Sequence, residues 1–302
     1  MAAAAPAVGM PDQPGHLFCF GLGYSALALV KTLANRGWTV AGTVRSENKA
    51  QALRGEGIDA HLFDGTAPLT GAARLLGRAT HILASVPPDD AGDPVVRHHA
   101  SDIADAQPGW LGYLSTTGVY GNHDGDWVDE TTPLTPSGVR GRRRQAAEQA
   151  WMDLYAQAGV PVHLFRLAGI YGPGRNAVVS LRTGSARRIV KPGQVFSRIH
   201  VADIVQVIAA SMARPAPGRA YNVCDDEPAP PQDLIAHAAD LTGLPAPPET
   251  PFDAADLSPM ARSFYADNKR VRNDRIKTEL GVTLAYPTYR EGLAALADDQ
   301  PA

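Results

Sequence analysis

The feature that most constrains the fold is a glycine-rich turn between two apolar strands, within residues 16–45. A buried strand (LFCF) leads into the turn GLGYSA, and a helix (LALVKTLANRG) and a second strand (WTVAGTVR) follow. Gly21, Gly23 and Ala26 occupy the small-residue positions of the pattern G-x-G-x-x-G/A. The first glycine permits a tight turn, the second lets the backbone approach a pyrophosphate, and the third small residue lets the helix pack closely on the strand. The segment therefore predicts a dinucleotide-binding site, the alternative being a tight turn in another kind of α/β domain.

The end of the second strand indicates which dinucleotide binds. A site for NAD usually places Asp or Glu about 20 residues after the glycines, where the carboxylate binds the ribose 2′-hydroxyl. Here the strand ends in Arg45 and Ser46, and Lys49 follows. Because a guanidinium binds a phosphate through paired N–H donors, we predict NADP(H) rather than NAD(H). A solvated arginine at a strand end is the alternative.

Strands and helices alternate from residue 16 to about residue 166, which predicts a parallel sheet with helices on both faces. We expect an α/β fold, a Rossmann-type doubly wound parallel sheet with a smaller C-terminal substrate lobe. Residues that follow the strands should line a crevice at the carboxyl edge of the sheet, unless they simply terminate their strands. The predicted cofactor-binding residues are Gly21, Gly23, Tyr24, Ser25, Ala26, Arg45, Ser46, Asp64, Ser85, Val86, Pro87 and Thr116.

The pattern changes beyond Gly172, where shorter and proline-rich pieces replace the alternating strands and helices. A helix over Ile199–Ala213 is expected to return to the sheet, so the two parts of the chain are interleaved. The predicted organisation is a disordered tail over residues 1–15, a Rossmann domain over 16–166 plus 198–224, and a substrate lobe over 167–197 plus 225–296. Met1 and Met10 are both candidates for the true start.

The composition is that of an ordinary globular protein, with 302 residues, 44% hydrophobic and 20% charged. A net charge of −3 gives no reason to expect a nucleic-acid partner or a membrane surface, and no apolar run is long enough to span a bilayer. Cys19 and Cys224 stand in apolar contexts and are predicted to be buried thiols, which suits a cytoplasmic location. The sequence has no metal-ligand spacing, no G-x-S-x-G elbow and no P-loop.

A set of ordered segments carries a family resemblance. They are YLSTTGVYG (113–121), VDETTPLTP (128–136), QAAEQ (145–149), FRLAGIYGPGR (165–175), RIHVADI (198–204) and YNV (221–223). Together they resemble the extended short-chain dehydrogenases/reductases, the NAD-dependent epimerase/dehydratase superfamily, over roughly residues 16–290. The resemblance implies a Rossmann domain that binds NAD(P), a small-molecule substrate held by the C-terminal lobe, and a homodimer.

The catalytic pattern of that family is incomplete in this chain. Active members use a Ser or Thr and, further along, a Tyr in Y-x-x-x-K, where the Lys helps the phenol to transfer a proton. Thr116 matches the hydroxyl position, but Arg140 stands where the Tyr belongs and Arg144 where the Lys belongs. No Tyr lies between Tyr120 and Tyr155. The resemblance therefore identifies an atypical extended member.

Three explanations for the missing Tyr stay open. Another group can carry the proton: Tyr120 follows the fifth strand, or packs there as a buried aromatic, and His123 lies in the next loop. A chemically activated substrate can accept hydride without an acid. The protein can also bind NADP(H) without turnover, as a regulator or scaffold. The candidate catalytic residues are Thr116, Tyr120 and Arg144.

The substrate side of the pattern is basic. Arg140 and Arg144 belong to the run RGRRR, which should begin a helix, where each cation opposes the helix dipole by about 0.3–1 kcal/mol. We predict that both hold a substrate carboxylate or phosphate, unless they are solvated; Arg175 opens the substrate lobe. Nucleotide-sugar members carry an Arg where this chain has Phe196, and Arg198 lies two residues later, which disfavours a nucleoside-diphosphate sugar.

We predict an NAD(P)-dependent oxidoreductase that acts on a small, anionic metabolite, with Thr116 orienting the substrate. The predicted substrate-binding residues are Arg140, Arg144, Arg175 and Arg198. One alternative is a non-catalytic NADP(H)-binding regulator or scaffold. Another is a sugar epimerase or dehydratase.

Overall fold

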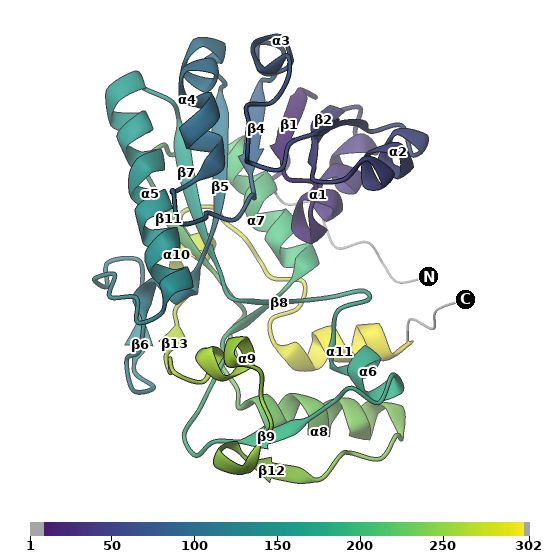
Figure 1. Cartoon of the computed structure of the whole chain (residues 1–302). Helices are drawn as coiled ribbons and strands as arrows, with labels where there is room; N and C mark the ends of the chain where they lie inside the picture. The colour runs from purple at the N-terminus through teal and green to yellow at the C-terminus, as the bar shows by residue number, and fades with distance from the viewer. Residues whose placement is uncertain (1–8, 299–302) are drawn as a thin grey trace.

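A parallel β-sheet forms the centre of the molecule in the computed structural model, which describes residues 9–298 (Figure 1). Within these residues seven strands build the sheet, and each pairs in parallel with its neighbours. In spatial order they are β11 (Ala220–Val223), β7 (Val162–Leu167), β5 (Trp110–Thr116), β4 (His81–Ala84), β1 (His16–Phe20), β2 (Thr39–Val44) and β3 (Asp59–Leu62). The order reverses between β1 and β4, where doubly wound sheets open a crevice at their carboxyl ends. The predicted fold class is confirmed.

The first strand shows why both faces of the sheet are buried. Leu17 and Cys19 lie in one hydrophobic cluster, and Phe18 and Phe20 lie in a second. Successive side chains of a strand point to opposite faces. A strand that is covered on both faces reads as a continuous apolar run, as LFCF does.

Helices cover each face. The face of Leu17 and Cys19 packs against α1 (Tyr24–Ala34), α2 (Glu47–Gly55), α7 (Val201–Ala213) and α10 (Asp274–Thr278). The face of Phe18 and Phe20 packs against α3 (Ala72–Leu76), α4 (Pro94–Ala106) and α5 (Val139–Ala158). The short 3₁₀ helix η1 (Thr117–Tyr120) follows β5 directly. The predicted returning helix begins two residues later than expected, because its first residues belong to strand β10 (Arg198–His200).

A smaller lobe, drawn below the sheet in Figure 1, has a core of its own. Its elements are α6 (Ala177–Arg182), β9 (Arg188–Val190), α8 (Pro231–Thr242), β12 (Glu249–Pro251), η2 (Phe252–Ala254), α9 (Pro259–Phe264) and α11 (Tyr289–Asp298). Strands β9 and β12 pair in parallel. Val178, Ala238 and Leu293 pack together between the lobe helices.

Two short strand pairs lie outside the main sheet, at the junction with the lobe. Strand β8 (Gly169–Tyr171) pairs with β10, and β6 (Trp127–Val128) pairs with β13 (Arg270–Val271). Beyond β13 the chain returns to the sheet, where Ile276 and Leu284 join the first hydrophobic cluster. Part of the segment predicted as lobe thus packs with the Rossmann domain, while the boundaries themselves stay a prediction.

The ends of the chain and the cysteines complete the fold. Residues 1–8 of the predicted tail lie outside the described range, and Met10 is half-buried against the first hydrophobic cluster. Cys19 and Cys224 are free and buried, as predicted. Among the helices of residues 9–298, none has the length and apolar character that a membrane crossing requires.

Candidate functional site

A cleft of ≈ 1500 Å³ lies between the carboxyl ends of the strands and the lobe. Its walls come from the glycine turn, the ends of β4, β5 and β7, the N-terminus of α5, and the lobe segments around β10 and α9. This position is the crevice at which doubly wound sheets bind ligands.

The glycine turn is shaped for a close approach to the cleft. Gly21 has φ +90°, and a Cβ atom there would lie 2.8 Å from the Ser85 hydroxyl oxygen. At Gly23, by contrast, a Cβ atom would meet nothing within 4 Å, since this residue faces open space in the cleft. Gly23 is the N-cap of α1, and no side chain caps that end. The first N–H groups of α1 are therefore available to a phosphate.

The residues that flank the turn hold it against the sheet. Ser85 donates a hydrogen bond of 2.6 Å to the Gly21 carbonyl and lines the cleft. Pro87 also lines the cleft, while Val86 packs against the second hydrophobic cluster. Ala26, the third small residue of the pattern, is a buried residue of α1 and packs in the first hydrophobic cluster.

The end of β2 gathers cationic and hydroxyl groups beside the turn. Arg45 and Ser46 are exposed, and Ser46 is the N-cap of α2 with no side-chain capping bond of its own. Lys49 reaches back to the turn, where its ammonium donates to the Leu22 carbonyl at 2.7 Å. This corner therefore offers donors to an anion.

The two carboxylates that follow β2 and β3 already have partners. Glu47 forms an ion pair of 2.8 Å with Arg54. Asp64 accepts hydrogen bonds from the Thr66 hydroxyl and backbone N–H, which hold the pKa of its carboxyl below the usual range. The cofactor-binding role of Asp64 stays a prediction.

At the end of β5, Thr116 lines the cleft at the entrance to η1. Its hydroxyl oxygen accepts a hydrogen bond of 3.1 Å from the Gly118 N–H. The hydroxyl proton remains free to be donated to a group in the cleft. The side chain is thus placed for the orienting role that the sequence predicts.

Tyr120 lies elsewhere. Its side chain is fully buried and is not part of the cleft wall. The phenol donates to Asn222 Oδ1 at 2.7 Å and accepts from Arg166 Nη1 at 2.9 Å, and burial raises its pKa to about 12. These contacts match the packed aromatic that was the alternative to a proton donor.

We expect Tyr120→Phe to lower the free energy of unfolding by about 1–3 kcal/mol, because the change leaves two buried polar groups without a partner. NADPH binding should be unchanged. Urea unfolding and calorimetric titration measure the two quantities. Tyr155→Phe, which also removes a hydroxyl but no hydrogen bond within residues 9–298, is the control. A loss of cofactor binding in Tyr120→Phe alone would contradict the structural role.

The predicted arginines of α5 do face the cleft. The Arg144 guanidinium lies 5.6 Å from the Tyr113 ring centre and donates to the Leu114 carbonyl at the end of β5. Arg140 lies 5.4 Å from the ring centre of Phe264, across the cleft mouth. Both side chains line the cleft near a helix N-terminus with no side-chain cap.

The two lobe arginines have different surroundings. Arg198 is buried and donates to the Phe196 and Ala229 carbonyls at 2.8 and 2.9 Å, so part of its guanidinium braces the lobe. Phe196 lines the cleft at the position where nucleotide-sugar members carry an arginine. The structure therefore gives the cleft an aromatic surface at this point.

Arg175 and Tyr24 connect the lobe to the glycine turn. The Tyr24 hydroxyl donates to the Pro173 carbonyl at 2.9 Å, and Arg175 lies 5.9 Å from the centre of the Tyr24 ring. Tyr24, Ser25 and Arg175 all line the cleft. The loop that opens the lobe is thus fastened beside the first turn of α1.

Sequence reasoning missed Lys269, which lines the cleft from the segment before β13. Its ammonium donates to the Gly121 carbonyl at 2.8 Å and lies 3.7 Å from Asp267, and the side chain is 10% exposed. Burial lowers the pKa of Lys269, which Asp267 opposes. No local pattern marks this lysine, because its partner Gly121 is 148 positions away in the sequence.

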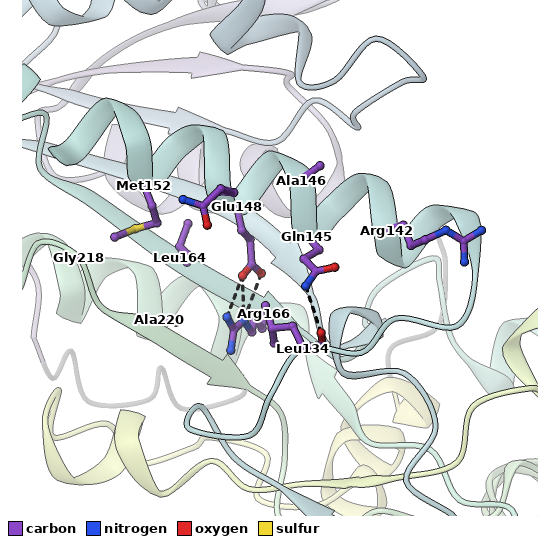
Figure 2. Close-up of a pocket in the computed structure, with 11 residues that line it drawn as sticks. Leu134, Arg142, Gln145, Ala146, Glu148, Met152, Leu164, Arg166, Gly218 and Ala220 are labelled. Carbon is purple, nitrogen blue, oxygen red and sulfur yellow. Dashed lines mark hydrogen bonds and ion pairs between the residues drawn. The ribbon is translucent and has the colours of Figure 1, made fainter. Parts of the chain in front are cut away.

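A second, smaller hollow of ≈ 540 Å³ lies along another face of α5 (Figure 2). Glu148 and Arg166 form a buried ion pair in its wall, with a shortest distance of 2.8 Å. Gln145 donates to the Leu134 carbonyl at 3.1 Å beside them. Across residues 9–298, His, Cys, Asp and Glu side chains form no group of three or more that could hold a metal ion.

Known proteins resemble this chain along most of its length. Residues 99–224 match the model of the NAD dependent epimerase/dehydratase family. A solved structure of a functionally unknown conserved protein from Silicibacter pomeroyi is 57% identical, with a TM-score of 0.86, and the match covers 94% of this chain and 99% of that one.

Two curated relatives are more distant. Protein YeeZ of Escherichia coli (strain K12) is 28% identical over 88% of this chain and 94% of its own length. The 3-diazoavenalumate denitrifying reductase of a Streptomyces species is 29% identical over 80% of this chain and 70% of its own length. Together with the glycine turn and the parallel sheet, these matches confirm the resemblance, and residues 99–224 carry the domain of the NAD dependent epimerase/dehydratase family.

Proposed function

We propose that this protein is an NADPH-dependent reductase of a small anionic molecule. The observation that carries the proposal is the composition of the cleft. Its wall contains both the glycine turn, where no side chain caps α1, and a group of arginines. The curated relative that is named as a reductase supports the redox class. Homodimer formation and a cytoplasmic location stay predictions.

The residues around the glycine turn fit a dinucleotide with a 2′-phosphate. Gly23 leaves room for the pyrophosphate at the start of α1. Arg45, Ser46 and Lys49 offer donors at the end of β2, and the nearby Glu47 is paired with Arg54. When bound, the reduced nicotinamide would supply a hydride to the substrate.

The substrate end of the cleft combines charge with apolar surface. Arg140 and Arg144 supply cations at the N-terminus of α5, where the helix dipole also favours an anion. Phe196, Phe264 and Tyr265 face the same cleft from the lobe. This combination fits a carboxylate or phosphate attached to an apolar body, with the Thr116 hydroxyl orienting the reacting oxygen.

The first experiment is calorimetric titration of NADPH and NADH into the wild-type protein and Arg45→Ala. Loss of a charge-assisted contact to the 2′-phosphate should cost about 1.5–3 kcal/mol, a loss of roughly 10- to 100-fold in NADPH affinity. NADH affinity should not change. Arg36→Ala, an exposed arginine before β2, is the matched control.

Each outcome of the titration has a defined meaning. Equal binding of the two cofactors by the wild-type protein would contradict the NADPH assignment. If neither cofactor binds, the proposal that this protein is a reductase is wrong. NADPH binding without turnover across a panel of anionic carbonyl compounds would instead support a non-catalytic regulator.

A further inference from the structure

A reductase of this kind needs a proton donor as well as a hydride donor, and the family's phenol is missing. The position of that Tyr is taken by Arg140, whose side chain lies against Phe264. This inference rests on the proposed function. If that function is right, another group of the cleft must release a proton at neutral pH.

Most ionisable groups in the cleft wall are unsuited to that task. Arg140 and Arg144 carry guanidinium groups, which proteins use to bind anions and not to release protons. The phenols of Tyr24 and Tyr171 donate their protons to backbone carbonyls, at 2.9 and 3.4 Å respectively. Tyr265 stays as a candidate, although its ring packs between Phe196 and Phe252 and burial raises its pKa.

Lys269 reaches the segment that follows β5. Its ammonium donates to the carbonyl of Gly121, the C-cap of η1, and Thr116 is the N-cap of the same short helix. Both Thr116 and Lys269 line the cleft. An ammonium carries three N–H donors, and Gly121 takes one of them. Another is left for a ligand.

The surroundings of Lys269 favour proton release. Its side chain is 10% exposed, and Asp267 lies 3.7 Å from the ammonium. Desolvation favours the neutral amine and lowers the pKa of Lys269, which Asp267 only partly offsets. Asp267 also accepts a hydrogen bond from the exposed Ser137 hydroxyl. Asp267 and Ser137 therefore connect the Lys269 amine to solvent through polar groups.

We propose that Lys269 is the proton donor of this active site, in place of the family's Tyr. With NADPH bound, its hydride would form the new C–H bond at the substrate carbonyl carbon, leaving NADP⁺, and the carbonyl π pair would move to oxygen. That oxygen takes a proton from Lys269 Nζ and becomes a hydroxyl. The neutral amine then regains a proton from solvent beside Asp267 and Ser137.

The activity test uses phenylglyoxylate, which carries a carboxylate, an aryl group and a ketone, with NADPH as the reductant. The variants are Lys269→Arg, which keeps the charge, Tyr265→Phe, which removes the rival phenol, and Lys277→Arg, a control at a half-buried lysine that is not part of the cleft wall. Loss of a general acid reduces kcat by about 100-fold or more. We expect that loss in Lys269→Arg, with KM for phenylglyoxylate and NADPH affinity little changed. Lys277→Arg should keep the wild-type kcat, and Tyr265→Phe should lose far less of kcat than Lys269→Arg does.

The pH profile separates proton donation from charge alone. A general acid must be protonated, so the wild-type kcat should fall as the pH rises through the pKa of Lys269. In Lys269→Arg the kcat should be low throughout and should not fall with pH in this way. A wild-type kcat and profile in Lys269→Arg, or a loss confined to Tyr265→Phe, would overturn the proposal.

A measurement that needs no turnover tests the role of Lys269 independently of the proposed function. Nuclear magnetic resonance of lysine labelled with ¹³C at Cε, in the full chain with NADPH, follows each ammonium as it titrates. Lys269, identified by its absence in Lys269→Arg, should titrate below Lys31, Lys49, Lys191 and Lys277. If the wild-type protein fails to reduce phenylglyoxylate, this titration alone decides. Titration of Lys269 at a lower pH than the other lysines supports the proposal. Titration of Lys269 together with the other lysines overturns it.

Discussion

Glu148→Gln should lower the free energy of unfolding by about 3–5 kcal/mol, because it leaves the Arg166 guanidinium buried without its counter-charge. In the wild-type protein the two side chains are only 4% and 8% exposed. Arg166 Nε and Nη2 both donate to the Glu148 carboxylate, which also accepts from the Ser115 hydroxyl at 2.5 Å. Loss of the negative charge therefore weakens several bonds at once.

The position of this pair makes the effect informative. Arg166 also donates to Tyr120, so the network supports η1, which directly follows Thr116 at the end of β5. Urea unfolding of Glu148→Gln measures the cost. The matched control is the double variant Glu148→Leu/Arg166→Met, which removes both charges and should recover much of the stability, since apolar residues can replace a buried ion pair. A double variant as unstable as the single one would show that packing, and not the unpaired charge, is responsible.

The second large effect concerns Asp225, a buried carboxyl just beyond β11. Neither of its oxygens has a hydrogen-bond partner among residues 9–298. Burial raises the pKa of Asp225 from 3.8 to about 8, against the pull of the nearby Arg198. The folded protein thus holds this proton more tightly than the unfolded chain does.

The direction of the pH effect follows from that difference. The contribution of Asp225 to stability is complete below pH 3.8 and is lost as the pH rises to about 8. Every tenfold difference in proton affinity between the folded and unfolded chains corresponds to about 1.4 kcal/mol of stability, so the whole effect amounts to several kcal/mol. Asp225→Asn cannot ionise, and we expect it to be more stable than the wild-type protein at pH 9.

Thermal and urea unfolding between pH 5 and pH 9 test this expectation. The advantage of Asp225→Asn over the wild-type protein should grow with pH and then level off above pH 8. Asp126→Asn, at an exposed carboxylate, should show no such trend. A constant difference between Asp225→Asn and the wild-type protein across the whole range would mean that Asp225 does not titrate there.

Local patterns in the sequence predicted the shape of the glycine turn. The tight turn at Gly21 and the close approach at Gly23 are properties of consecutive residues, so a spacing rule captures them. The same holds for Arg140 and Arg144, which begin α5 as expected from a basic run before a helical segment. These features need no knowledge of distant contacts.

The reacting end depends on contacts that no local pattern records. Tyr120 follows a strand, as a cleft residue would, but Asn222 and Arg166 hold its phenol inside the protein. Lys269 enters the cleft only because β13 pairs with β6, which brings residues far apart in sequence together. Side-chain direction at a strand end and the pairing of two-residue strands are decided by tertiary packing.

The interleaving of sheet and lobe has a consequence for the cooperativity of the protein. The chain leaves the sheet after β7, returns for α7 and β11, leaves again through α8, and returns once more at α10 before α11 ends in the lobe. No single break would separate the two bodies, because a cut anywhere between Gly172 and α10 removes parts of both. Each crossing links the hydrophobic clusters through the backbone. Sheet and lobe should therefore unfold in one transition, as a single thermodynamic unit.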